Sequence, residues 1–173
     1  MAADPVLETG LPMQLYDLRG ISFLIVDDNR FMRRIIVGLL QGMDVTEIIE
    51  ARSGKQALEK LRQNQFDVII TDLEMEDGNG FGVIDAIRGD DESPDPMLPI
   101  IVLSANTMKH TILQARDAGM TEFLAKPVTA DTLYRRIVTI IEGARSFVRT
   151  GNYFGPDRRR KSDTVYMGPK RRR

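Results

Sequence analysis

The sequence predicts an α/β protein, a (βα)5 doubly wound sandwich with five parallel strands and helices on both faces of the sheet. Three observations predict this class. Short runs of apolar, mostly β-branched residues alternate with amphipathic segments, and their spacing is typical of βαβ units. The apolar runs are continuous, as expected for strands buried on both faces. Four of the runs end at a polar residue that can take part in chemistry.

The predicted elements follow in order along the chain. Strands are expected at residues 21–26, 47–51, 68–72, 100–104 and 122–125. Four helices follow from apolar stripes, and the second also from the capping-box spacing of Ser53 and Gln56. Their stripes are Met32, Ile35, Ile36, Leu39 and Leu40; Ala57, Leu58 and Leu61; Phe81, Ile84 and Ile87; and Leu133, Ile137, Ile140, Ile141 and Ala144. A weaker pattern predicts a further helix over residues 107–118, and the acids and prolines of residues 90–99 predict an exposed loop.

Length and composition predict three parts. The 173 residues, 42% of them hydrophobic, fit one globular domain at residues 20–146 between a flexible leader at 1–19 and a tail at 147–173. Leu15, Tyr16 and Leu18 of the leader are candidates to dock on the domain. Cysteine is absent, which excludes disulfides, thiolate zinc sites and cysteine nucleophiles. We see no signal peptide and no membrane-spanning run, so we expect a cytoplasmic protein.

The formal net charge of −1 hides a charge asymmetry. From residue 147 onward, nine basic and two acidic residues give a net charge of +7. Residues 1–146 hold 15 basic and 23 acidic side chains, a net charge of −8, so an acidic body carries a basic tail.

The tail contains an internal repeat. The segment Tyr153–Arg160 recurs 13 residues later as Tyr166–Arg173, with six of eight positions identical. This module has few apolar residues, so we expect the tail to be disordered until it binds. Three interpretations stay open: a solvated end, a segment that binds nucleic acid, an anionic membrane or a protein partner, or a segment that docks on the acidic domain. We favour partner binding or self-docking, through Arg158, Arg159, Arg160, Arg171, Arg172 and Arg173.

The ends of four predicted strands supply a candidate site. The first strand ends in Asp27 and Asp28, the third in Asp72, the fourth in Ser104 and the fifth in Lys126. In open α/β sheets, ligands bind at the carboxyl ends of the strands, so these side chains are expected to gather at one edge.

The chemistry of this set points to a metal ion and a phosphoryl group. Two carboxylates about 4 Å apart repel by roughly 4 kcal/mol at an effective dielectric constant near 20, so three of them need a counter-charge. Oxygen ligands with no histidine or cysteine nearby favour Mg²⁺ or a similar hard cation. Lys126 and Ser104 can hold phosphoryl oxygens, and an acid that faces these groups can accept a phosphoryl group as the nucleophile.

Over residues 21–146 the sequence resembles the receiver domain of two-component response regulators, in particular chemotaxis-type receivers that lack a DNA-binding output domain. The resemblance rests on a combination of positions around the strand ends: Asp27, Asp28, Asp72, Met75, Gly80, Ser104, Ala105, Phe123, Lys126 and Pro127. One departure is Glu76, since the family usually has proline after the residue matching Met75.

The resemblance implies a flavodoxin-like strand order, 2-1-3-4-5, and a phosphorelay switch. Asp72 would accept a phosphoryl group from a histidine kinase or phosphotransfer protein and catalyse its own phosphorylation and dephosphorylation. Mg²⁺ would be held by Asp27, Asp28, Asp72 and the backbone carbonyl of Glu74, and Lys126 would pair with the phosphoryl group. The Lys126–Pro127 peptide would be cis.

The family's switch residues also have counterparts. Ser104 would move toward the phosphoryl group, and Phe123 would turn inward and change the face that binds a downstream protein. Glu74 and Asn106 occupy positions that tune the phosphoryl lifetime in the family. Phe123 is alternatively an ordinary core aromatic residue. Three arginines beside the first helix stripe, Arg30, Arg33 and Arg34, are either kinase contacts or solvated.

Two other functions compete with the switch. One is a phosphohydrolase with an aspartate nucleophile, resembling the haloacid dehalogenase family; that family needs a second aspartate where this chain has Glu74. The other is a pseudo-receiver that serves only as an interaction module. The intact set of acids together with Lys126 favours the switch.

Overall fold

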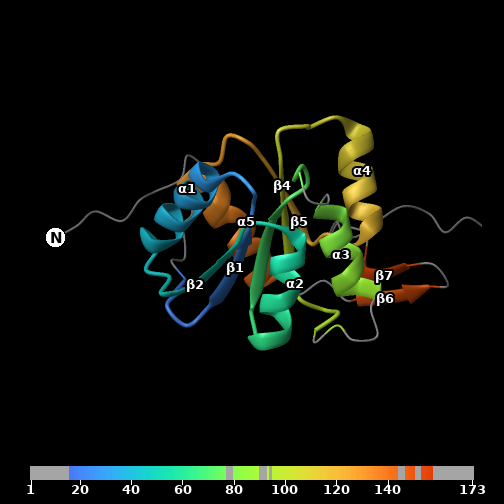
Figure 1. Cartoon of the computed structure of the whole chain (residues 1–173), viewed down its shortest axis with the longest axis horizontal. Helices are drawn as coiled ribbons and strands as arrows, with labels where there is room; N and C mark the ends of the chain where they lie inside the picture. The colour runs from blue at the N-terminus through green and yellow to red at the C-terminus, as the bar shows by residue number, and fades with distance from the viewer. Residues whose placement is uncertain are drawn as a thin grey trace, which may run out of the picture.

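The computed structural model describes residues 16–76, 80–89, 93, 95–143, 147–150 and 153–157. Its centre is a parallel sheet with strand order β2-β1-β3-β4-β5, as predicted (Figure 1). The strands are β1 Ser22–Val26, β2 Glu47–Ala51, β3 Val68–Asp72, β4 Ile100–Ser104 and β5 Glu122–Ala125. The helices are α1 Arg30–Gln41, α2 Gly54–Gln63, α3 Gly80–Gly89, α4 Lys109–Ala118 and α5 Ala130–Glu142.

The strands of the sheet send alternate residues into two separate hydrophobic clusters. Leu24 and Ile69 belong to the cluster covered by α2, α3 and α4, whereas their neighbours Phe23 and Ile70 belong to the cluster covered by α1 and α5. Figure 1 shows the same division, with α2 and α3 in front of the sheet and α5 behind it. Burial on both faces explains why the strands read as continuous apolar runs instead of alternating ones.

The predicted elements agree with the structure to within one or two residues at their ends. The α4 helix begins at Lys109 instead of residue 107, because Met108 is still extended and serves as the N-cap. At its other end Gly119 adopts the left-handed conformation, with φ of 108°, that commonly terminates a helix.

The end of the predicted leader is ordered against the domain. Leu18 is buried in the cluster of α1 and α5. The Tyr16 hydroxyl donates to Glu142 Oε1 at 2.7 Å, and the Tyr16 N–H donates to the Tyr134 hydroxyl at 3.0 Å. The docking suggested for Tyr16 and Leu18 is therefore confirmed, and residues 1–15 lie outside the described part of the chain.

The beginning of the predicted tail is also folded. Strands β6 Phe147–Thr150 and β7 Tyr153–Pro156 form an antiparallel hairpin, and β7 packs against α3 and α4 (Figure 1). The prediction of disorder from residue 147 is wrong for these strands. The prediction considered only the apolar content of the segment itself. A two-stranded hairpin of this kind is stabilised by packing on the rest of the domain, here on α3 and α4.

Arg88 of α3 connects the domain to this hairpin. Its side chain is buried, with Nε donating to the Gly119 carbonyl at 3.0 Å and Nη1 donating to the Pro96 carbonyl at 2.7 Å. Its guanidinium also lies 5.1 Å from the ring centroid of Phe147 in β6, and burial lowers the pKa of Arg88 to about 10. The hairpin is thus part of the folded unit.

Within the described residues, no helix is long and apolar enough to cross a membrane.

Candidate functional site

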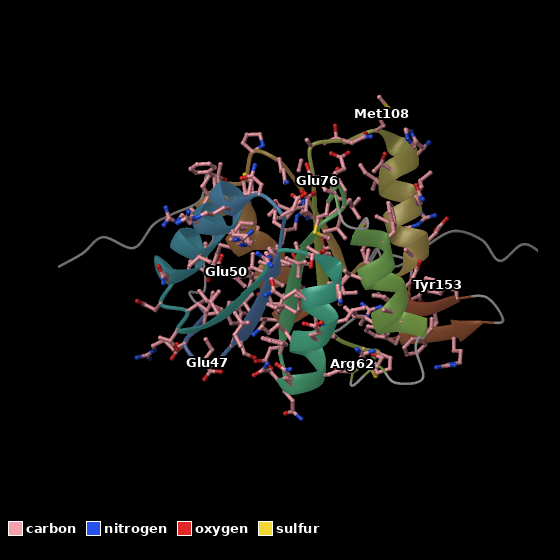
Figure 2. The ribbon with its side chains drawn as sticks, in the orientation of Figure 1. Glu47, Glu50, Arg62, Glu76, Met108 and Tyr153 are labelled. Atoms are coloured by element: carbon pink, nitrogen blue, oxygen red, sulfur yellow. The ribbon has the colours of Figure 1, made fainter. Side chains whose placement is uncertain are left out.

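The register of the sheet brings the predicted site residues to one edge. Val26 pairs with Thr71, so the residues that follow them, Asp27 and Asp72, lie beside each other at the carboxyl ends of β1 and β3. Figure 2 places Glu76, which follows β3, at this end of the sheet and Glu47, which begins β2, at the other. Parallel pairing thereby converts distant positions in the sequence into one cluster.

Three carboxylates form the centre of the site. Asp27, Asp28 and Asp72 each offer an oxygen, and these oxygens lie within 4.8 Å of one another. Asp27 is fully buried and Asp72 is 4% exposed, whereas Asp28 is partly exposed to solvent. Burial raises the pKa of Asp27, since the charged form loses hydration; the N–H of Asn29 and the Lys126 ammonium partly oppose this shift. An all-carboxylate set that includes a poorly hydrated member fits a hard divalent cation such as Mg²⁺.

Lys126 supplies the positive charge at the site. Its Nζ lies 2.7 Å from Asp72 Oδ2 and 3.3 Å from Asp27 Oδ2. Burial lowers the pKa of Lys126, but its hydrogen bond to Asp72 and its attraction to both carboxylates outweigh this effect, so the pKa is raised overall. The lysine is therefore held in its charged form beside Asp72, the phosphoryl acceptor predicted from the sequence.

The loop after β3 holds two of the carboxylates through backbone N–H groups. The N–H of Glu74 donates to Asp72 Oδ1 at 3.2 Å, and the N–H of Glu76 donates to Asp28 Oδ2 at 2.9 Å. Proline, which the family usually has at the Glu76 position, could not donate this second hydrogen bond. The departure noted in the sequence therefore adds a contact to the site.

Ser104 is buried at the end of β4, where its hydroxyl is bonded within its own loop. Ser104 Oγ accepts the N–H of Asn106 at 2.9 Å and donates to the Asn106 carbonyl at 3.2 Å. Phe123, paired with Val102 in the sheet, is half-buried and packs against the cluster of α2, α3 and α4. The predicted switch residues thus lie on β4, which pairs with β3, and on β5, the next strand of the sheet.

The remaining predicted residues divide into two groups. The Lys126–Pro127 peptide is cis. The predicted tail-binding residues lie outside the described part of the chain, namely Arg158, Arg159, Arg160, Arg171, Arg172 and Arg173.

Two residues of the site were missed by sequence reasoning. Asn29 caps α1 by accepting the N–H groups of Phe31 and Met32, and its own N–H donates to Asp27 Oδ1 at 2.8 Å. The sequence signal that could have identified Asn29 is its residue type, since asparagine is a favoured N-cap and here directly follows the acid pair. Arg33, predicted to be solvated or a kinase contact, turns inward to the backbone of that pair.

Comparison with known proteins assigns this arrangement to a family. The response regulator receiver domain matches residues 23–138 of the chain. The chain belongs to this family. It is 34% identical over 124 residues to chemotaxis protein CheY-3 of Vibrio cholerae, covering 72% of this chain and 94% of the relative. It is also 35% identical over 122 residues to chemotaxis protein CheY of Pseudomonas aeruginosa, covering 70% and 97% respectively.

Solved structures show the same receiver fold. CheY4 of Vibrio cholerae superposes with a TM-score of 0.64 at 29% identity, covering 69% of this chain and 98% of that one. The receiver domain of the sensor histidine kinase PA1611 from Pseudomonas aeruginosa gives a TM-score of 0.61 at 26% identity, covering 70% and 96%. That structure has a magnesium ion coordinated in its active-site cleft.

Membership of this family establishes the class of function. The chain is a CheY-like receiver domain, a phosphoacceptor in two-component signalling, and receivers of this kind act with histidine kinases and downstream proteins. The match supports the predicted signalling switch over the phosphohydrolase alternative.

Proposed function

We propose that Asp72 is the phosphoacceptor of a Mg²⁺-dependent switch. The observation that carries this assignment is the position of the Asp72 carboxylate. It lies among two other carboxylates that can share a cation with it, and Lys126 Nζ is only 2.7 Å away. The donor would be a histidine kinase or phosphotransfer protein. The absence of cysteine fits a reducing compartment, and the cytoplasm is the proposed location.

The roles of the residues follow from their places. A carboxylate oxygen of Asp72 attacks the phosphorus of a phosphohistidine, a P–O bond forms, and the P–N bond breaks as the histidine nitrogen leaves. Lys126, already bonded to Asp72, stays charged beside the transferred group and offsets its negative charge. Asp27, Asp28, Asp72 and the Glu74 carbonyl would hold Mg²⁺, which supplies positive charge to the phosphoryl oxygens.

The switch would act through the neighbouring strands. We propose that the Ser104 hydroxyl leaves Asn106 for the phosphoryl group and that Phe123 moves into the space this opens. The half-buried position of Phe123 leaves it room to change its exposure. Such a change would alter the surface of α4, β5 and α5 that a downstream protein contacts.

Beryllofluoride, a mimic of the phosphoryl group, tests the metal requirement and the switch in one experiment. Added with Mg²⁺ and followed by amide NMR, it should shift the resonances of Asp72, Ser104 and Phe123, and EDTA should reverse the shifts. The physical reason is that the acid cluster cannot hold a further anion without the cation. Equal shifts in the presence of EDTA, or shifts confined to residues away from β3 and β4, would contradict the proposal.

We also propose that the arginine-rich segment after the hairpin binds an anionic partner or docks on the acidic domain. The support is its sequence, which repeats a basic module, whereas residues 1–146 carry a net charge of −8. Truncation after Asp157 keeps β6 and β7 and removes the segment.

The truncated chain should keep its phosphorylation site but lose partner binding, or show a changed phosphorylation rate if the segment docks on the domain. Because either contact depends on charge, the difference from the full chain should shrink as the salt concentration is raised. Pull-down and phosphorylation rates that are identical for the two chains at low salt would refute a binding role.

A further inference from the structure

Arg33 contacts the backbone of the acid pair. Its Nη1 donates to the Asp27 carbonyl at 2.8 Å and to the Asp28 carbonyl at 3.3 Å. The Arg33 side chain is only 14% exposed, whereas Arg30 and Arg34 on the same helix are exposed. A guanidinium can reach two acceptors at once because its donors are fixed in a planar fork.

A second contact fixes the orientation of this guanidinium. Arg33 Nε donates to Glu50 Oε2 at 2.9 Å, and Glu50 lies on β2 (Figure 2). The next residue of β2, Ala51, accepts the N–H of Asp27 at 3.2 Å. Strand β2 therefore holds the acid pair by two routes, one directly through its backbone and one through Glu50 and Arg33.

The acid pair gains from this support because one of its members is partly exposed. The carboxylate of Asp28 is open to solvent on one side, and it accepts the N–H of Glu76 from the neighbouring loop. A ligand that must be ordered when the metal binds lowers the affinity, whereas a preorganised ligand does not. Fixing the carbonyls of Asp27 and Asp28 leaves their carboxylates facing the cluster they share with Asp72.

We propose that Arg33 is a positioning residue for the metal site, acting through the two backbone carbonyls of the acid pair and oriented by Glu50. This inference rests on the proposed function, since it concerns the Mg²⁺ that the three aspartates would hold. Residues that orient ligands from outside the coordination shell typically change metal affinity by about 10–100-fold when they are replaced.

The test is the Mg²⁺ dissociation constant, measured by amide NMR titration of the full chain without any phosphoryl donor. Arg33→Gln should raise it by about tenfold or more. Arg33→Lys keeps the positive charge but lacks the planar fork of donors. Its Mg²⁺ dissociation constant should therefore be closer to that of Arg33→Gln than to that of the wild type. Arg135→Gln, which removes an exposed arginine paired with Asp131 on α5, should bind Mg²⁺ as the wild type does.

A second readout separates positioning from a loss of the site. At saturating Mg²⁺, the rate at which Arg33→Gln is phosphorylated by acetyl phosphate should recover toward the wild-type rate. If Arg33→Gln does not fold, Glu50→Gln takes its place, because Glu50 is 45% exposed and its replacement leaves α1 intact. That variant should weaken Mg²⁺ binding severalfold.

The outcomes distinguish a failure of the positioning role of Arg33 from a failure of the proposed Mg²⁺-dependent function. Wild-type Mg²⁺ affinity in the folded Arg33→Gln variant overturns the positioning role and leaves the proposed function standing. Full recovery of affinity in Arg33→Lys also overturns it, because charge alone would then explain the effect. A wild-type chain that does not bind Mg²⁺ overturns the proposed function and this inference with it.

Discussion

Replacing Gly80 with alanine should destabilise the fold by about 2–3 kcal/mol and strongly reduce phosphorylation of Asp72. A Cβ at Gly80 would overlap the backbone oxygen of Asp72 and lie 2.9 Å from the Asp72 carbonyl carbon and 3.0 Å from Leu73 Cα. These are backbone atoms of β3 and of the residue after it, so none of them can rotate away.

The close approach arises because α3 begins directly against the end of β3. The N–H of Gly80 donates to the Leu73 carbonyl at 2.9 Å, which fixes this distance. An alanine would therefore push the start of α3 away from the strand end that carries Asp72. Because Lys126 Nζ is 2.7 Å from Asp72, a shift of a few tenths of an ångström would already disturb the site.

Gly82, two residues further along α3, provides a matched control. A Cβ at Gly82 would meet nothing within 4 Å, so Gly82→Ala should be stabilising by about 0.5–1 kcal/mol through helix propensity. Urea unfolding and the rate of phosphorylation by acetyl phosphate measure both effects. The account fails if the two variants have the same stability and both are phosphorylated at the wild-type rate.

The strands and the site were predictable because their signals are local. Each buried strand is a run of apolar residues, and each of Asp27, Asp72, Ser104 and Lys126 stands at or just after the end of such a run. Parallel pairing then brings the carboxyl ends together. The order of the strands came from the resemblance to receivers, since no residue pattern specifies which strands are neighbours.

The contacts that the sequence did not reveal are non-local. Arg88 is stabilised by the carbonyls of Pro96 and Gly119 and by the ring of Phe147, which the chain reaches only through the fold. The hairpin was missed for the same reason. The sequence around Arg33 is that of a solvated helix residue, and its inward turn depends on Glu50 of β2 and on the carbonyls of the acid pair.

The structure also explains why the first copy of the tail repeat has glycine at position 155. A Cβ at Gly155 would lie 3.1 Å from Gly119 Cα and 2.6 Å from the Tyr153 hydroxyl oxygen, so glycine lets β7 approach the end of α4 without displacing these groups. This requirement comes from a tertiary contact that the repeat alone did not indicate.

The second large effect is expected from Asp72→Asn, which removes the proposed nucleophile while keeping the size of the side chain. The amide cannot form the acyl phosphate, so phosphorylation should be lost completely. The fold should persist, because asparagine retains a side-chain oxygen that can accept the N–H of Glu74.

The measurement that tests the central claim most directly is intact-mass analysis of wild type and Asp72→Asn after incubation with acetyl phosphate and Mg²⁺. The account predicts one added phosphoryl group in the wild type, no adduct when EDTA replaces Mg²⁺, and no adduct in Asp72→Asn. Beryllofluoride binding controls for an acyl phosphate that decays too fast to detect. A phosphoryl adduct on Asp72→Asn, or a wild type that neither gains an adduct nor binds beryllofluoride, would contradict the account and favour a pseudo-receiver.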